Sequence, residues 1–167
     1  MSLVALGSTL QLKDCFNARS GDAARILMVL SPTCPGCLRG VSIVAAATRE
    51  VETTNVSLLV LWTAMRPGDC ASAAAGASAA FDSASGFSHF WEEDGWPIST
   101  ALRPILGLGG YDPTKSAWDV YLFYGPGPTW VGLGPPTPAE WAHPIQPDPG
   151  VGDRLTFATV ARWLDGG

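Results

Sequence analysis

Two cysteines, Cys34 and Cys37, stand three positions apart in the segment Cys-Pro-Gly-Cys. Two thiols at this spacing in the first turn of a helix can close into a small disulfide without unfolding the chain around them, so the pair could be redox-active. If Cys34 caps the helix, Pro35 falls at its first position, where the N–H that proline lacks would be unpaired anyway. The motif therefore predicts a helix that begins at the cysteine pair.

The helix terminus implies different roles for the two sulfur atoms. Unpaired N–H groups at a helix N-terminus favour an anion, so we expect Cys34 to be the solvent-accessible thiolate that attacks a substrate. Cys37, one turn further, should be shielded and should attack the mixed disulfide formed at Cys34. The direction of electron flow depends on the reduction potential, which one sequence leaves open.

Metal binding is the main alternative use of such a pair. A structural zinc site normally takes four ligands, and the other sulfur and imidazole side chains, Cys15, Cys70, His89 and His143, are isolated in the sequence. We therefore expect no structural metal site and no cofactor besides the cysteine pair itself. A carrier that holds Cu(I) or Hg(II) between two thiolates is the alternative from outside the enzymes.

Apolar runs indicate the elements that would position the pair. Residues 25–30 and 56–65 are continuous apolar runs typical of buried strands, and residues 38–50 between them have helical spacing. Such a strand–helix–strand unit normally closes right-handed and parallel. The remaining sequence predicts helices over residues 69–81, 99–106 and 153–164, and a hairpin of strands 118–124 and 129–134.

Composition limits the class of protein. The chain has 167 residues, 47% of them hydrophobic, and a net charge of −5. These values predict one folded domain over residues 1–167 and argue against a nucleic-acid partner. Purely apolar stretches such as residues 26–30 are far too short to span a membrane, and no signal peptide is visible. With only four cysteines, the chain is expected in the cytoplasm.

A buried strand that leads into Cys-Pro-Gly-Cys on a helix, within a βαβ-ββα order, resembles the thioredoxin superfamily. The resemblance implies an α/β fold: a thioredoxin-like mixed sheet flanked by helices, with a helical insertion before the β-hairpin. It also implies a thiol:disulfide oxidoreductase, with Cys34 attacking, Cys37 resolving, and Pro35 and Gly36 in contact with the substrate. That substrate would be a protein or small-molecule thiol or disulfide.

The sequence departs from the family before the first strand of the hairpin. Most members have a cis-proline there, whereas Ser116, Ala117 and Trp118 precede this strand here. We therefore expect Ala117 and Trp118 to take the place of that proline in substrate binding.

Two further side chains are candidates for accessory roles. Asp119 could be a buried carboxylate that moves protons for Cys37. Ser31 lies three residues before Cys34, where peroxiredoxins have a threonine, so a thiol peroxidase is a second hypothesis within the enzymes. The chain also has seven tryptophans, some of which could line a substrate groove or the contact of a homodimer.

Overall fold

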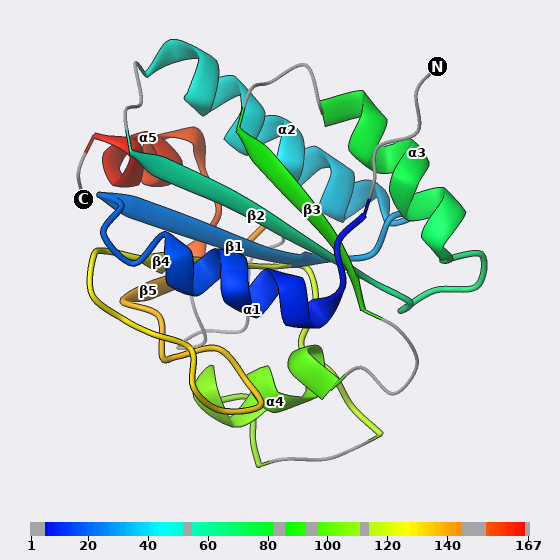
Figure 1. Cartoon of the computed structure of the whole chain (residues 1–167). Helices are drawn as coiled ribbons and strands as arrows, with labels where there is room; N and C mark the ends of the chain where they lie inside the picture. Colours follow the sequence, from blue (N-terminus) through cyan, green and yellow to red (C-terminus); the bar gives the residue numbers. More distant parts are fainter. Residues whose placement is uncertain are drawn as a thin grey trace.

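Six strands form one sheet in the order β3-β2-β1-β4-β5-β6. The computed structural model describes residues 6–51, 55–81, 86–92, 97–110, 114–144 and 153–165, and Figure 1 shows their arrangement. The elements are α1 (Thr9–Ala18), β1 (Ala24–Leu30), α2 (Pro35–Glu50), β2 (Val56–Thr63), α3 (Ala71–Phe81), β3 (Phe87–Glu92), α4 (Pro97–Ile105), β4 (Val120–Tyr124), β5 (Glu140–His143), β6 (Asp153–Arg154) and α5 (Phe157–Leu164).

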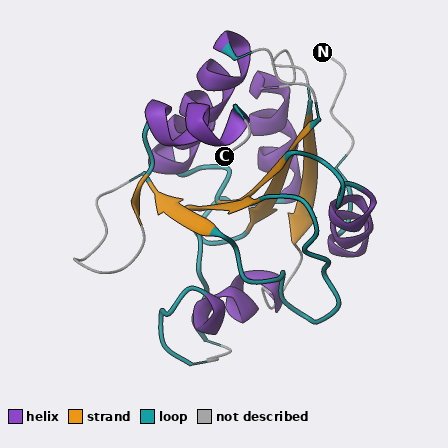
Figure 2. Ribbon diagram, turned by 90° about the vertical axis from the view of Figure 1, so that its left-hand side faces the viewer, coloured by secondary structure: helices purple, strands orange, loops and turns teal. Residues whose placement is uncertain are grey.

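Helices cover both faces of the sheet (Figures 1 and 2). Helices α2, α3 and α5 contribute to the core on one face, and α1 and α4 to the core on the other. Side chains alternate along β1: Ile26, Met28 and Leu30 join the first core, and Leu27 and Val29 join the second. In a strand that is buried on both faces, every side chain points into an apolar core. The sequence of β1 is therefore continuously apolar from Ile26 to Leu30 and does not alternate with polar residues.

The sheet is mixed, and its order places α2 over the central strands. Strand β1 pairs in parallel with β2, from Ala24 opposite Val56 to Leu30 opposite Trp62, and antiparallel with β4 on its other side. Strands β4 and β5 are antiparallel to each other. The predicted α/β fold class, a thioredoxin-like mixed sheet flanked by helices, is confirmed. No helix in the described ranges is long and apolar enough to cross a bilayer.

The predicted partner of β4 is wrong. Residues 129–134 form a loop, and the strand beside β4 is β5. The reason is that a side chain of helix α1 forms hydrogen bonds with the backbone of this loop. The Trp130 N–H donates to Asn17 Oδ1 at 2.7 Å, and Asn17 Nδ2 donates to the Trp130 carbonyl at 3.0 Å. Only Trp130 enters the core, whereas Val131 and Leu133 are 86% and 62% exposed.

The prediction of a helical insertion between β2 and β4 is wrong in part, because the insertion also contains the edge strand β3. This strand pairs in parallel with β2 and ends at Glu92. The Glu92 side chain is fully buried and accepts hydrogen bonds from the Ile98 and Ser99 N–H groups at the start of α4. At the end of the chain, α5 begins at Phe157 with Thr156 as its N-cap, later than the predicted residue 153.

Helix α2 lies very close to β4 at one glycine. A Cβ atom added at Gly40 would overlap the hydroxyl group and ring of Tyr121. The Tyr121 hydroxyl donates to the Cys37 carbonyl at 3.1 Å, and both Gly40 and Tyr121 are buried. The missing side chain at Gly40 therefore sets how closely the first turns of α2 approach β4.

Gly40→Ala should destabilise the protein. The added methyl group must displace Tyr121 from a packed core, which costs about 1–3 kcal/mol of unfolding free energy. Gly76→Ala in α3 is the matched control, since nothing lies within 4 Å of a Cβ there, and it should stabilise by up to about 1 kcal/mol through helix propensity. Urea unfolding of both variants checks this, and equal stability of the two would show that α2 and β4 are not tightly apposed.

Candidate active site

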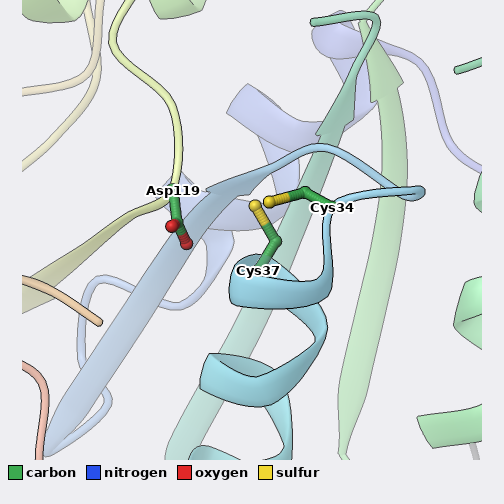
Figure 3. Close-up of side chains that lie close together, drawn as sticks. All are labelled: Cys34, Cys37 and Asp119. Carbon is green, nitrogen blue, oxygen red and sulfur yellow. The ribbon is translucent and has the colours of Figure 1, made fainter. Parts of the chain in front are cut away.

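The cysteine pair lies where α2 begins, at the carboxyl end of β1. Cys34 is the N-cap residue, in extended backbone conformation, and Pro35 occupies the first helical position as predicted. Both cysteines are free thiols, and Figure 3 shows their sulfur atoms side by side. Cys37 is fully buried, as predicted, but Cys34 is only 8% exposed and is thus less open to solvent than we expected.

Cys37 is surrounded by groups that keep its proton in place. Burial raises the pKa of the Cys37 thiol, and the negative charge of Asp119 raises it further. The Ser31 backbone N–H donates to Cys37 Sγ at 3.4 Å and opposes these effects. Cys37 is therefore a protonated thiol at neutral pH, and it needs a proton acceptor before it can act as a nucleophile.

Asp119 lies beside the two sulfur atoms. It immediately precedes β4, is 3% exposed, and its carboxylate faces the two sulfur atoms (Figure 3). The ligand atoms of Cys34, Cys37 and Asp119 all lie within 4.8 Å of one another. Burial raises the pKa of Asp119, while the charge of His143 and a hydrogen bond with Cys37 lower it by less.

The backbone at Asp119 is itself unusual. Its φ is +59°, a left-handed conformation that asparagine and aspartate tolerate better than most residues. This conformation directly precedes β4. The structure thus brings together the two cysteines and the carboxylate that the sequence named as an accessory candidate.

Pro35 and Gly36 have separate places beside the pair. Pro35 is exposed on the rim, while Gly36 is half-buried. A Cβ atom at Gly36 would lie 3.3 Å from Asp119 Oδ2 and 3.7 Å from Cys34 Sγ. The glycine therefore leaves room for the carboxylate to approach the cysteines.

The two residues expected in place of the proline point to different cores. Trp118 is half-buried and packs against the core that contains the cysteine pair. Ala117 is buried in the core on the opposite face, and its N–H donates to the Ser99 carbonyl at 2.8 Å. Only Trp118 therefore has its side chain on the face of the cysteines.

Asp69 is a site residue whose role sequence reasoning missed. The sequence predicted Asp69 as the first residue of the following helix, but α3 begins at Ala71 and the Asp69 carboxylate ties the loop before α3 to the loop before α2. It accepts hydrogen bonds from the Ser31 hydroxyl (2.7 Å), the Thr33 hydroxyl (2.6 Å) and the N–H groups of Thr33, Met65 and Arg66 (3.1, 2.9 and 2.8 Å). No local pattern could have shown that two loops distant in sequence meet at this carboxylate.

The Ser31 hydroxyl is engaged in this cluster. Its proton is donated to Asp69 rather than toward Cys34. Burial alone would raise the pKa of Asp69, but the hydrogen bonds together lower it below its ordinary value of 3.8. The cluster therefore holds the segment that leads into the cysteine pair as long as Asp69 is ionised.

The two other cysteines lie outside this group. Cys15 is half-buried on α1. Cys70 is exposed before α3, and hydrogen bonds from Ser72 and from the backbone of Ala73 lower the pKa of its thiol. An exposed thiol of this kind reacts readily with disulfides and alkylating agents, so it must be removed before the cysteine pair is assayed.

Asp69→Asn should loosen the segment before the cysteine pair and destabilise the fold by about 1–3 kcal/mol near neutral pH, because an amide nitrogen replaces one acceptor oxygen. A lowered carboxyl pKa contributes stability above its ordinary value of 3.8, and this contribution disappears as the pH falls through the lower folded value. The difference between wild type and variant should therefore shrink below about pH 4. Urea unfolding over a pH series measures it, and a difference that does not change with pH would contradict this role.

Comparison with known proteins finds a distant structural similarity. No family model matches the chain, and no curated protein matches it. Among solved structures, it is similar to a secreted Mycobacterium tuberculosis disulfide oxidoreductase homologous to E. coli DsbE, with 12% identity, a TM-score of 0.47, and coverage of 89% of this chain and 85% of that chain. The strand order and the placement of the cysteine pair themselves assign the fold: the chain has a thioredoxin-like fold, with Cys-Pro-Gly-Cys at the N-terminus of α2.

Proposed function

We propose that the chain is a thiol:disulfide oxidoreductase whose redox centre is the Cys34–Cys37 pair. The observation that carries the proposal is the group of two free sulfur atoms and one carboxylate within 4.8 Å at the start of α2. A dithiol in contact with a proton acceptor has every group that thiol–disulfide exchange requires. The substrate is a thiol or disulfide of a protein or a small molecule.

The first step takes place at Cys34. Its thiolate attacks one sulfur of a substrate disulfide, a bond forms between that sulfur and Cys34 Sγ, and the other substrate sulfur leaves as a thiolate that takes a proton from water. The N–H groups at the start of α2 favour the negative charge from which the step begins. The exposed Pro35 and the half-buried Gly36 and Trp118 form the side from which a substrate would approach.

The second step takes place at Cys37. Its proton passes to Asp119 as its sulfur attacks Cys34 Sγ, the intramolecular disulfide forms, and the substrate sulfur leaves and takes up the proton. Two electrons have then moved from the dithiol to the substrate. The reverse sequence oxidises a substrate dithiol, and the reduction potential of the pair decides which direction prevails.

The thiol peroxidase is the weaker hypothesis. It requires the Ser31 hydroxyl to orient a peroxide at Cys34, but this hydroxyl donates to Asp69 and its residue is fully buried. A location in the cytoplasm and a homodimer stay predictions from the sequence.

Cys37→Ser should trap the intermediate of the first step. Without a resolving thiol, a substrate that has reacted with Cys34 cannot leave, so incubation with oxidised glutathione should give one stable adduct per chain by mass spectrometry. All proteins carry Cys70→Ser, which removes the exposed thiol. Cys34→Ser should give no adduct. An adduct of equal yield in both variants would show that Cys34 is not the attacking cysteine.

Asp119→Asn should slow the second step while leaving the fold intact. Asparagine tolerates the left-handed backbone at this position and keeps the size of the side chain, but it cannot accept the Cys37 proton, so resolution of a preformed mixed disulfide should slow about 10²-fold. Because burial raises the pKa of Asp119, the wild-type rate should rise with pH above the usual carboxyl range, and this rise should be absent in the variant.

Stopped-flow release of the leaving thiol measures the resolution rate, and thermal unfolding serves as the control. The variant should be as stable as wild type, because a neutral amide replaces a buried carboxylate. An unchanged rate and pH profile would remove Asp119 from the reaction.

A further inference from the structure

The group at the start of α2 has the dimensions of a cation site. The two Sγ atoms and a carboxylate oxygen of Asp119 lie within 4.8 Å of one another, and they come from the N-cap, the first turn of α2 and the start of β4 (Figure 3). Around a tetrahedral zinc ion, two sulfur ligands lie about 3.8 Å apart, and a sulfur and an oxygen about 3.6 Å apart. No separation in the group therefore exceeds the value expected around zinc by more than about 1.2 Å.

An unpartnered buried atom independently points to a ligand. Asp119 Oδ1 is buried and has no hydrogen-bond partner among the described residues, and Asp119 as a whole is 3% exposed. A buried carboxylate oxygen without a partner is costly, and a bound cation would offset that cost. The Ser31 N–H at 3.4 Å from Cys37 Sγ supplies the hydrogen bond that ligand thiolates commonly receive from the surrounding chain.

We propose that the reduced chain binds one zinc ion through Cys34 Sγ, Cys37 Sγ and a carboxylate oxygen of Asp119, and that zinc binding and disulfide formation exclude each other. Binding displaces whatever protons the two sulfur atoms still hold and transfers no electrons. Two thiolates, one carboxylate and Zn²⁺ leave a net charge of −1, which the N-terminus of α2 favours. A water molecule would complete four ligands on the side where Cys34 reaches solvent.

The third ligand distinguishes zinc from softer ions. Cu(I) and Hg(II) are satisfied by two thiolates, whereas zinc takes sulfur and carboxylate oxygen in the same site. The expectation of no metal site rested on ligands close in sequence, and Asp119 became a candidate ligand only when the fold brought β4 against α2. The site uses the atoms of the proposed redox centre but does not require that the chain turn over disulfides.

The test is competition for Zn²⁺ between the chain and a chromophoric chelator under anaerobic conditions, in a Cys15→Ser/Cys70→Ser background that leaves only the site cysteines. The reduced protein should bind one zinc per chain, and the affinity should rise with pH as the thiol protons leave. The oxidised protein should bind none. Asp119→Asn should weaken zinc binding about tenfold or more and change Cu(I) binding far less, because only zinc uses the carboxylate.

Each outcome decides between the inferences. Failure of the reduced protein to compete for zinc, or equal zinc affinity of a folded Asp119→Asn variant, would overturn the metal site. The comparison of reduced and oxidised wild-type chain needs no variant, so it decides even if Asp119→Asn does not fold. Zinc binding without disulfide turnover would support the metal site and contradict the proposed oxidoreductase function. Disulfide turnover without zinc binding would support the proposed function and contradict the metal site.

Discussion

Cys34, Cys37 and Asp119 share one buried volume, and they cannot all carry a negative charge there. Burial raises the pKa of Cys37 and of Asp119, and the negative charge of Asp119 raises the pKa of Cys37 further. The N-terminus of α2, the Ser31 N–H and the charge of His143 offset part of this cost. A proton held between Cys37 and Asp119, a disulfide that removes both thiolates, and a cation that neutralises them are three solutions to one electrostatic problem.

The scaffold holds these groups together from three directions. Tyr121 on β4 meets α2 at Gly40 and bonds to the Cys37 carbonyl. Asp69 fastens the segment before Cys34 to the loop before α3. Strand β1 leads into Cys34, and β4 follows Asp119. Because β1 and β4 are antiparallel neighbours, the last residues of β1 and the first residues of β4 lie side by side at the same end of the sheet. Small displacements of this frame would alter the proposed proton transfer from Cys37 to Asp119, since a proton moves only across hydrogen-bond distance.

The sequence pattern predicted β1, β2 and the start of α2 well, because each of these elements leaves its signal in a few consecutive residues. Strands β1 and β2 are buried on both faces and therefore continuous in apolar residues, and Pro35 fits the first position of a helix. The errors fall where distant backbone competes for hydrogen bonds. Asn17 of α1 forms hydrogen bonds with the backbone of Trp130 and prevents a hairpin there. Strand β3, which pairs with β2 and ends at the buried Glu92, interrupts the insertion that was predicted to be helical.

The sequence by itself determined that Cys34 and Cys37 occupy one helical turn, because covalent spacing and proline geometry act within a few residues. It also named Asp119 as a candidate, from its place at the start of a predicted strand. Only the tertiary structure decided that the carboxylate reaches the sulfur atoms, that Asp69 holds the loop before them, and that Cys34 is largely buried. Those facts depend on how closely α2, α3 and β4 pack, and packing distance is set by side chains far apart in the chain.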